Sequence, residues 1–315
     1  MSPFTPALDA LDKIILGKSR QLRLCLACVL ARGHLLIEDI PGVGKTTLAH
    51  GLAQVLGLSW QRVQFTSDLL PADILGVSVF DRATQQFEFR KGPIFTQLLL
   101  ADEVNRASPR TQSALLEAME ERQVSIDGVS HALPDPFFVV ATQNPHEQLG
   151  TFALPESQLD RFLMRVELGY PDAAHERELL VESDRRTRLG QAASAQAGPP
   201  LTPADVLRVQ ATLPQIHVSG PLLDYVQALI ANSRGRADLR LGLSPRAGQG
   251  LIRAARAWAL LAGRDMVLPE DVQAVLPAVA GHRLELRQSA PGAAGSGSAR
   301  RDLIRELVES VPLRD

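Results

Sequence analysis

HLLIEDIPGVGKTTLAHGLAQVL, residues 34–56, is the stretch that decides the fold. It opens with an apolar run at residues 35–37, short enough for one buried strand, and turns through a Pro-Gly-x-Gly sequence at residues 41–44. A helix is expected to follow, because apolar residues recur at helical spacing at Leu48, Ala49, Leu52, Ala53 and Leu56. A strand, a glycine-rich turn and a helix in this order predict a phosphate-binding loop.

The residue types in this turn suit a nucleoside triphosphate. Glycines let successive backbone N–H groups turn inward around phosphates without a Cβ clash, and the positive end of the following helix points at the same anion. Lys45 is expected to reach the β- and γ-phosphates, and the Thr46 hydroxyl to coordinate Mg²⁺. The predicted ATP-binding segment comprises Pro41, Gly42, Val43, Gly44, Lys45, Thr46 and Thr47.

One residue departs from the usual loop pattern. G-x-x-x-x-G-K-[ST] begins with a glycine, and this chain has Asp39 at that position. Asp tolerates unusual backbone angles better than most residues, so the loop is still expected to form. The departure puts only the phosphate affinity in doubt.

Length and composition describe an ordinary globular protein. The chain has 315 residues, which suggests about two domains, with 45% hydrophobic and 22% charged residues. A formal net charge of -2 and an aromatic content of 4% give no general attraction to nucleic acid. No apolar stretch approaches the length of a membrane span, and the first residues lack a signal-peptide pattern, so a cytoplasmic protein is predicted.

Strand and helix patterns alternate through the first part of the chain. Helices are expected over residues 5–32, interrupted at Gly17, and over 109–121, and strands over 60–65, 95–101 and 137–141. Segments 77–89 and 124–133 are predicted β-hairpins, the second because of its Asp-Gly turn. The prediction is an α/β domain at residues 1–188 with a mostly parallel sheet, helices on both faces and two β-hairpin inserts. A linker at 189–203 and a smaller, all-α domain at 204–315 follow.

Polar residues at two predicted strand ends complete a candidate site. Asp102 and Glu103 follow an apolar strand, and because ligands bind outside the carboxyl ends of parallel strands, both are expected beside the phosphate-binding loop. Asp102 can hold Mg²⁺ through water, and Glu103 can polarise the attacking water as general base. Asn144, after the next strand, can hydrogen-bond the γ-phosphate or that water, or alternatively open a turn before Pro145.

Two arginines are candidates for neutralising charge at the γ-phosphate. Arg161, in LPESQLDRF, follows a short helix expected to end the α/β domain, and Arg246, in GLSPRA, opens a helix of the second domain. An arginine supplied in trans is worth on the order of 10³–10⁵ in rate. Each is equally well explained as a surface arginine in a weak ion pair, and the residues alone leave this choice open.

The two cysteines, Cys25 and Cys28, form a CxxC. A redox pair or half of a zinc site would be the functional interpretations. The surrounding QLRLCLACVLA reads as one helix, and the chain has no second thiol pair. Two small apolar side chains on a buried helix face are therefore expected.

Seven segments in fixed order resemble the MoxR family of AAA+ ATPases over most of the chain: EDIPGVGKT, FTSDLLPADILG, KGPIF, LLLADEVNRASPRTQSALLEAMEE, ATQNP, LPESQLDRF and LSPRA. The resemblance implies an AAA+ P-loop core followed by a helical lid domain, assembled as a homo-hexameric ring with ATP at the subunit interfaces. It assigns Asn144 as the sensor in cis, Arg161 as the finger entering the neighbour's site and Arg246 as the lid-domain sensor.

The same resemblance extends to the base and to partners. It implies that Ile15, Leu16 and Gly17 lie against the adenine and that the two hairpins line the pore of the ring. Members of the family remodel client proteins as chaperones or insert cofactors and metals into them, often with a partner that carries a von Willebrand A domain. The chain is thus expected to be a Mg²⁺-dependent ATP hydrolase that acts on a protein client.

Other functions stay open. A DNA-directed AAA+ motor predicts basic hairpins, yet 77–89 offers Arg82 against Asp81 and Glu88, which makes nucleic acid an unlikely partner. A nucleotide-gated scaffold that hardly turns over is disfavoured by the intact Asp102-Glu103 pair. A magnesium-chelatase-like motor subunit is a closer alternative, which the sequence distinguishes only weakly.

Overall fold

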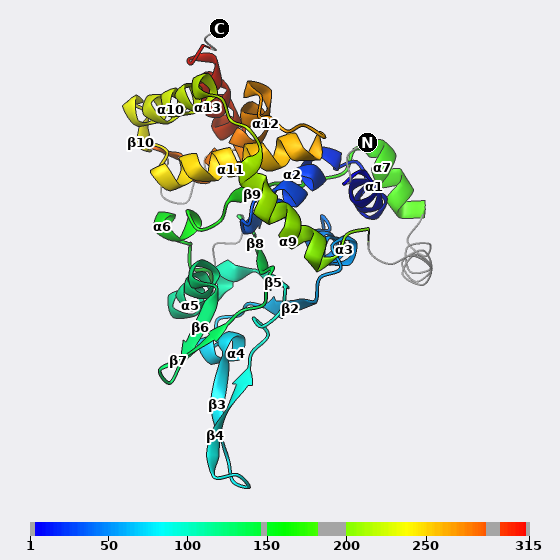
Figure 1. Ribbon diagram of the computed structural model, residues 1–315, viewed down its shortest axis with the longest axis vertical. Helices are drawn as coiled ribbons and strands as arrows, with labels where there is room; N and C mark the ends of the chain where they lie inside the picture. Colours follow the sequence, from blue (N-terminus) through cyan, green and yellow to red (C-terminus); the bar gives the residue numbers. More distant parts are fainter. Residues whose placement is uncertain (1–3, 146–149, 182–199, 288–296, 313–315) are drawn as a thin grey trace.

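The computed structural model describes residues 4–145, 150–181, 200–287 and 297–312 (Figure 1). An α/β core carries a cap of helices at one end, and a long β-hairpin projects from the other end. The predicted linker at residues 189–203 lies mostly outside the described residues, so the domain boundaries stay predictions.

The core is a five-stranded sheet in the order β2-β5-β8-β1-β9, and every neighbouring pair is parallel. The strands are β1 (Leu35–Glu38), β2 (Trp60–Gln64), β5 (Leu98–Asp102), β8 (Phe138–Gln143) and β9 (Met164–Val166). The predicted parallel sheet is confirmed. Because all five strands point the same way, their carboxyl ends lie along one edge and their amino ends along the opposite edge.

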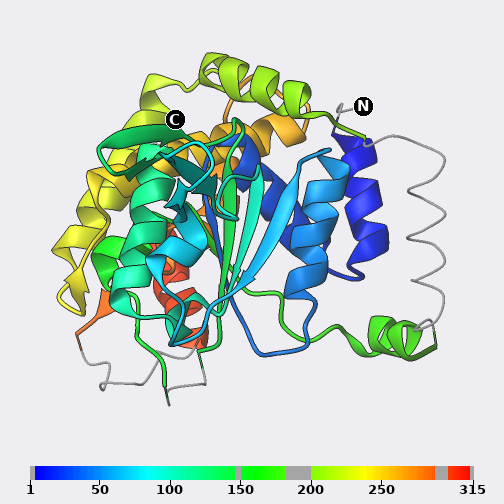
Figure 2. The same ribbon diagram turned by 90° about the horizontal axis from the view of Figure 1, so that it is seen from below.

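Alternate residues of each central strand enter two separate apolar cores. In β1, Leu35 and Ile37 face one core and Leu36 faces the other, and β5 and β8 alternate in the same way. The first core contains α1 (Thr5–Ile14), α2 (Ser19–Leu30) and α3 (Lys45–Val55), whereas α4 (Pro71–Leu75) and α5 (Pro109–Glu121) pack on the other face. Figure 2 shows the sheet between α5 on one side and α1 and α3 on the other. Helices on both faces are thereby confirmed.

Both predicted hairpins are present. The first is β3 (Gly76–Asp81) with β4 (Gln86–Lys91), and the second is β6 (Gln123–Ile126) with β7 (Val129–Ala132). They meet through the ring of Phe89, which stacks on the ring of His131 with centroids 4.1 Å apart. The two inserts therefore lie side by side below the sheet (Figure 1).

The part that follows the core is mainly helical. Its helices are α9 (Pro203–Thr212), α10 (Gly220–Gly235), α11 (Pro245–Leu261), α12 (Pro269–Ala280) and α13 (Gly297–Glu309), with a 3₁₀ turn at Leu213–Gln215. Short strands β10 (Leu239–Leu241) and β11 (Glu285–Leu286) pair antiparallel, a feature that the helical pattern did not predict. Ser and Thr side chains cap α9, α10 and α11, which explains where these helices begin.

One strand of the core was missed. After α6 (Glu156–Leu159), which the sequence analysis expected to end the α/β domain, the chain enters β9 beside β1, and α7 (Ala173–Val181) follows. Three residues give too short an alternation to be recognised as a strand. Arg161 consequently stands between α6 and the edge strand of the sheet.

Candidate functional site

The phosphate-binding loop runs from β1 into α3 with two glycines in left-handed conformations. Gly42 has φ +87°, and Gly44, the N-cap residue of α3, has φ +92°. A Cβ at Gly42 would meet nothing within 4 Å, so the backbone angle and not crowding requires glycine there. Since the first N–H groups of an α-helix lack intrahelical partners, the start of α3 is suited to an anion.

Lys45 and Thr46 are the first two residues of α3. The Nζ of Lys45 donates to the backbone oxygen of Asp39 at 2.6 Å, which holds the ammonium group against the start of the loop. Pro41, Val43 and Thr47 complete the loop and the first helical turn. The loop thus has a cation, a hydroxyl and a helix N-terminus in one place, as phosphate binding requires.

Asp39 fits its position for a reason that the sequence analysis did not give. Asp39 is not among the described non-glycine residues with positive φ, so tolerance of unusual angles does not explain it. Its buried carboxylate accepts the N–H groups of Leu168 and Gly169 at Oδ2, at 2.7 and 2.6 Å, and that of Ile40 at Oδ1, at 2.9 Å. Asp39 therefore ties the loop to the chain that leaves β9.

Asp102 ends β5 beside the loop edge, where its carboxylate has two partners. Thr142 on β8 donates its hydroxyl to Oδ1 at 2.6 Å, and Arg62 on β2 donates to Oδ2 from Nε at 3.1 Å and from Nη2 at 2.7 Å. The Thr142 hydroxyl in turn accepts the N–H of Glu103 at 2.9 Å. Thr142, on the next strand of the sheet, thus aligns both acidic residues.

Glu103 adopts a left-handed conformation with φ 57° and ψ 48°, which is uncommon for a residue with a side chain and often marks functional positions. Its Oε2 accepts from Gln64 Nε2 at 2.9 Å and pairs with Arg106 Nε at 2.6 Å. Asn144 is buried just beyond β8, and the carbonyl of its neighbour Gln143 accepts the N–H of Asp39 at 3.2 Å. The carboxyl-end edge thereby brings Lys45, Thr46, Asp102, Glu103 and Asn144 to neighbouring strand ends.

The oxygen donors at this edge fit Mg²⁺. The Thr46 hydroxyl and the Asp102 carboxylate are hard ligands, and a magnesium ion in such sites completes its shell with waters and phosphate oxygens. Among the described residues no group of three or more His, Cys, Asp or Glu could hold a metal ion by itself. A magnesium site in which Thr46 and Asp102 supply two ligands and the triphosphate supplies others agrees with these donors and with the lack of a larger ligand group among the described residues.

Residues before α2 lie against the loop. Ile15 is buried, and its Cδ1 is 3.7 Å from the Cβ position of Gly44. Gly17 has φ +69° and faces the imidazole of His175, a residue that the sequence analysis did not select. Ile15, Leu16 and Gly17 thus form one short turn that leads past the loop toward α7.

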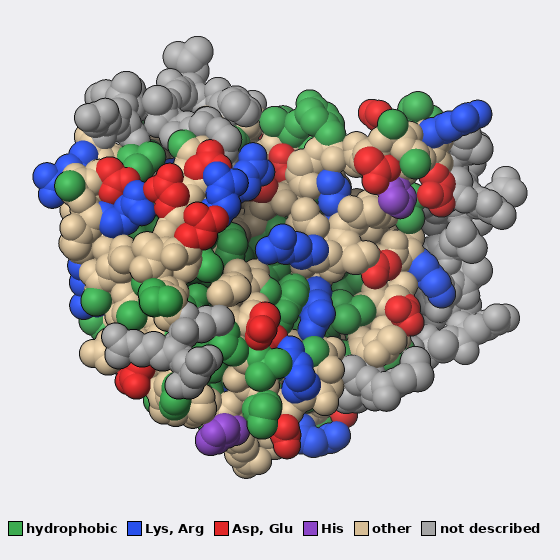
Figure 3. All heavy atoms as spheres, turned by 90° about the horizontal axis from the view of Figure 1, so that it is seen from above, with side chains coloured by type: hydrophobic (Ala, Val, Ile, Leu, Met, Phe, Trp, Pro, Cys, Tyr) green, Lys and Arg blue, Asp and Glu red, His purple; other side chains and the backbone are tan. Residues whose placement is uncertain are grey.

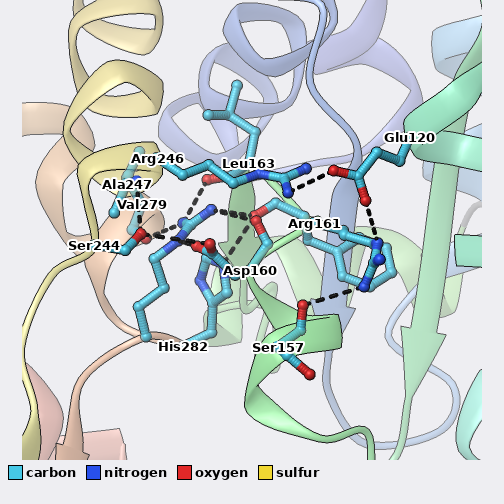
Figure 4. Close-up of polar contacts among 12 residues, drawn as sticks. Glu120, Ser157, Asp160, Arg161, Leu163, Ser244, Arg246, Ala247, Val279 and His282 are labelled. Carbon is cyan, nitrogen blue, oxygen red and sulfur yellow. Dashed lines mark hydrogen bonds and ion pairs between the residues drawn. The ribbon is translucent and has the colours of Figure 1, made fainter. Parts of the chain in front are cut away.

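Arg161 and Arg246 lie together at the opposite edge of the sheet (Figure 4). Arg161 Nε pairs with Glu120 Oε2 at 2.7 Å, and Arg246 Nη1 pairs with Glu120 Oε1 at 2.9 Å. Burial alone would raise the pKa of Glu120, but the two guanidinium groups, Arg246 first, hold it below its ordinary value. One carboxylate at the end of α5 therefore gathers both arginines.

The length of β1 gives the distance between the phosphate-binding loop and the pair of arginines at Glu120. Leu163, two residues after Arg161, donates its N–H to the carbonyl of His34 at the amino end of β1, whereas the loop begins at Asp39 beyond its carboxyl end. Five residues of extended chain span about 17 Å. An arginine side chain cannot cover that length, so the structure does not bring Arg161 or Arg246 to the loop of its own chain.

A partly buried ion pair lies between the two arginines. Arg283, three residues after α12, pairs with Asp160 through Nε and Oδ1 at 2.6 Å and donates to the carbonyls of Asp160, Phe162 and Leu163. Ser244 donates to the other oxygen of Asp160 at 3.4 Å and caps α11, whose first turn carries Arg246. The helical part and the Arg161 segment are consequently joined at Asp160 (Figure 4).

A cavity of about 220 Å³ opens beside these residues. Six of its lining residues are arginines: Arg32, Arg122, Arg161, Arg246, Arg253 and Arg283. Burial lowers the pKa of Arg122, Arg253 and Arg283, as expected where several cations share one partly enclosed space. Sequence reasoning found only two of the six, because the others come from separated segments and match no motif.

Cys25 and Cys28 are fully buried on α2. Burial raises the pKa of the Cys25 thiol to about 12 and that of Cys28 well above its ordinary value. Thiols that stay protonated inside the first apolar core agree with the structural interpretation of the CxxC.

The loop edge and the sheet that carries it define a class. P-loop nucleotide-binding proteins of the AAA+ type combine five features that this structure has. These are a strand, a glycine loop, a helix that begins with Lys and Thr, an acidic pair on a neighbouring parallel strand and a following helical part. In the described part of the chain no helix is both long and apolar enough to cross a membrane.

Comparison with known proteins places the chain more narrowly. The model of the "ATPase family associated with various cellular activities (AAA)" matches residues 34–164, and the "AAA lid domain" matches residues 231–307. Chaperone MoxR1 of Mycobacterium tuberculosis is 41% identical over 90% of this chain and 76% of its own. Protein YeaC of Bacillus subtilis, of uncharacterised function, is 41% identical over 97% of this chain and 93% of its own.

A solved structure agrees with these relatives. The crystal structure of a candidate ATPase from Cytophaga hutchinsonii superposes with a TM-score of 0.85 at 35% identity, covering 99% of this chain and 95% of that one. The chain belongs to the MoxR family of AAA+ ATPases.

Proposed function

We propose that the protein hydrolyses ATP as a homo-hexameric ring and uses the energy to remodel a protein client. Each nucleotide is held by the loop edge of one subunit and completed by Arg161 and Arg246 of the next. The observation that carries this proposal is the pairing of both arginines with Glu120 at the edge of the sheet opposite their own loop. A monomer therefore has half of each site.

The residues of the loop edge have distinct tasks in this mechanism. The N–H groups at the start of α3 and the Lys45 ammonium bind the phosphates, and Thr46 and Asp102 hold Mg²⁺, which neutralises phosphate charge when bound. Glu103 takes the proton of the attacking water, and Asn144 orients that water or the γ-phosphate. Arg161 and Arg246 of the neighbour stabilise the charge that develops on the transferred group.

Both acidic residues must exchange partners before they can act. Arg62 covers one oxygen of Asp102, and Gln64 and Arg106 hold Glu103. These contacts compete with metal and water for the two carboxylates. Assembly and nucleotide binding supply the competing interactions.

Work on a client is assigned to the hairpins. Phe80 and Phe87 are 49% and 75% exposed at the end of the β3–β4 hairpin, and Val129 is 56% exposed on the β6–β7 hairpin. Exposed apolar side chains on projecting strands suit contact with another protein (Figure 1). The client and a von Willebrand A domain partner follow from the family and belong to this proposal.

A DNA-directed motor is the second candidate, and charge argues against it. The β3–β4 hairpin carries Arg82, Arg90 and Lys91 against Asp81 and Glu88, which leaves one net positive charge. Figure 3, which looks onto the end with the helical cap, shows the described Lys and Arg side chains with Asp and Glu side chains beside them. A magnesium-chelatase-like motor would use the same site on a different client, so capture of the client by an ATP-trapped Glu103→Gln ring separates the two.

Complementation between two inactive variants tests the split site. Arg161→Ala alone should bind ATP normally and lose about 10³-fold or more in turnover, and Lys45→Ala alone should bind no nucleotide. Mixed rings should regain activity where an intact loop meets an intact arginine pair. Normal turnover by assembled Arg161→Ala rings would refute the assignment, and Arg305→Ala, a surface variant of α13, is the matched control.

A further inference from the structure

Strand β9 physically joins the two edges of the sheet. At the amino end of β9, Leu163, which is two residues after Arg161, donates its N–H to the carbonyl of His34. Met164, Arg165 and Val166 then pair in register with Leu35, Leu36 and Ile37 of β1. At its carboxyl end the chain reaches Leu168 and Gly169, which contact the phosphate-binding loop. Since β9 is the edge strand, β1 is its sole sheet neighbour in the order of the described strands.

Asp39 makes that contact with its side chain. The Leu168 and Gly169 N–H groups both donate to Oδ2, while Oδ1 accepts the N–H of Ile40 inside the loop. The Asp39 side chain is buried, and Gly169 has φ +65°, so the chain turns sharply where it is held. A glycine in place of Asp39, as in the general loop pattern, would offer neither oxygen.

A second tie lies next to the first. Glu38, directly before Asp39, pairs with Arg165 of β9, whose side chain is 9% exposed, and accepts from Gln143 Nε2 at 3.1 Å. Arg300 of α13 lies 3.9 Å from the same carboxylate. Two successive acidic residues at the start of the loop thus hold β9 at Arg165 and the chain just after β9 at Leu168 and Gly169, which leaves β9 little freedom to move independently of the loop.

Lys45 connects this junction to the nucleotide. Its ammonium donates to the backbone oxygen of Asp39, and the lysine of such a loop is also the residue that contacts the triphosphate. Asp39 thus contacts the Lys45 ammonium with its carbonyl oxygen and the Leu168 and Gly169 N–H groups with its carboxylate. Any shift of Asp39 on nucleotide binding is therefore passed to the carboxyl end of β9.

From these contacts we propose that Asp39 is a positioning residue for the arginines that a subunit presents to its neighbour. Asp39 couples the position of the phosphate-binding loop, through β9, to the Asp160–Leu163 segment that carries Arg161. Because Ser244 and Arg283 both contact Asp160, the same coupling reaches the turn that carries Arg246. The inference rests on the proposed function, because it assumes that Arg161 acts in the neighbour's site.

A donor assay tests the coupling separately from the subunit's own chemistry. Acceptor subunits carry Arg161→Ala, so they hydrolyse ATP only when a donor supplies the arginines. Donor subunits carry Glu103→Gln, so they bind ATP without hydrolysing it. Labelled donors are mixed in excess with acceptors, their incorporation is measured, and kcat and KM of the acceptor sites are determined per incorporated donor.

Adding Asp39→Gly to the donor should lower kcat at the acceptor sites at least tenfold and leave their KM for ATP unchanged. The donor's own nucleotide affinity is measured separately, and stimulation is compared at ATP concentrations that saturate every donor, so that a change in donor binding does not enter the comparison. Asp205→Ala in the donor is the matched control, since Asp205 accepts the N–H of Thr202 at the start of α9 and does not contact β9. That donor should stimulate normally.

An Asp39→Asn donor keeps the side-chain volume and one acceptor oxygen, so it should restore most of the stimulation, and it replaces Asp39→Gly if that variant does not fold. Asparagine can keep its oxygen toward Leu168 and Gly169 and lose only the contact to Ile40, so equal loss with Asn and Gly would overturn the positioning role. Full stimulation by the Asp39→Gly donor would also overturn it and leave the proposed function standing. Full stimulation by an Arg161→Ala/Glu103→Gln donor would instead refute the proposed function.

Discussion

The two edges of the sheet differ in how they are built. At the carboxyl-end edge, the phosphate-binding loop, Asp102, Glu103 and Asn144 each follow directly from a strand, so strand order alone places them together. At the amino-end edge, Arg161, Arg246 and Glu120 come from a turn, a lid helix and α5, and only side-chain contacts gather them. The first edge collects the residues proposed to bind the phosphates, and the second collects a group of cations around one carboxylate.

This difference teaches how the chemistry is divided. An edge that binds phosphate can exist in a single subunit, because its N–H groups and Lys45 lie on one continuous segment. The two arginines at the other edge lie about 17 Å from the phosphate-binding loop of their own chain, too far to contact a phosphate bound there. In the proposed ring, the second edge of one subunit would lie against the first edge of the next, and the predictions below probe that division.

The largest expected effect beyond the complementation experiment concerns Arg246. If Arg246, like Arg161, acts in the site of the neighbouring subunit, Arg246→Ala should lower ATP turnover of the ring by about 10²–10³-fold. This is comparable with the loss of one preorganised hydrogen-bond donor to a transition state. ATP binding by the isolated subunit should not change, because Arg246 is far from its own loop. Equilibrium binding and steady-state phosphate release measure the two quantities, and weakened binding in the monomer would move Arg246 to the loop edge.

The second effect is the pH dependence of the unfolding free energy, and it arises from His34 at the amino-end edge. His34 is buried there, where its Nδ1 accepts the N–H of Val139 and its Nε2 lies 3.2 Å from the carbonyl of Met119, beside Glu120. Burial lowers the pKa of His34 to about 4, so this imidazole stays neutral in the folded protein. Burial also lowers the pKa of His282, which contacts the carbonyl of Phe162.

The sign follows from linkage between protonation and folding. The unfolded chain binds a proton at His34 near pH 6.5 and the folded chain only near pH 4, so stability is full above 6.5 and falls toward 4. His34 alone should remove about 3 kcal/mol of unfolding free energy over that window. In His34→Gln this part of the pH dependence should vanish, whereas exposed His217→Gln should keep it. Denaturant titrations at several pH values provide the measurement, and an unchanged slope in His34→Gln would contradict the assignment.

The smallest effect concerns Glu120. Its two ion pairs are partly exposed, so Glu120→Gln should cost the isolated subunit no more than about 1 kcal/mol, and the cost should shrink at high salt. Nucleotide binding should be unaffected. Glu117→Gln, one turn earlier on α5 and exposed, is the control. A loss of several kcal/mol would mean that the amino-end edge is a structural core and not a preassembled site.

Much of the loop edge could be predicted from the sequence because it consists of short, continuous patterns. Gly44-Lys45-Thr46 and Asp102-Glu103 each sit within one strand–turn unit, and hydrophobic periodicity located the strands that carry them. Both hairpins and most helices were predicted for the same reason. The contacts of Asp39 could not be predicted, because its partners Leu168 and Gly169 are about 130 residues away and offer only backbone N–H groups.

The amino-end edge could be predicted only in part. Arg161 and Arg246 were selected, but no local pattern shows that both bind Glu120 or that Arg283 joins Asp160 to the lid. β9 was missed because three residues carry too little periodicity to separate a strand from a loop. Contacts between distant segments decide this edge, and a single sequence does not contain them in readable form.

The claim that one active site needs two subunits is tested most directly by ATPase activity per subunit as a function of protein concentration, with assembly followed in the same samples. The rate per subunit should rise steeply as rings form and fall toward zero on dilution to monomers that still bind ATP. A rate per subunit that stays constant down to fully dissociated protein would contradict the account.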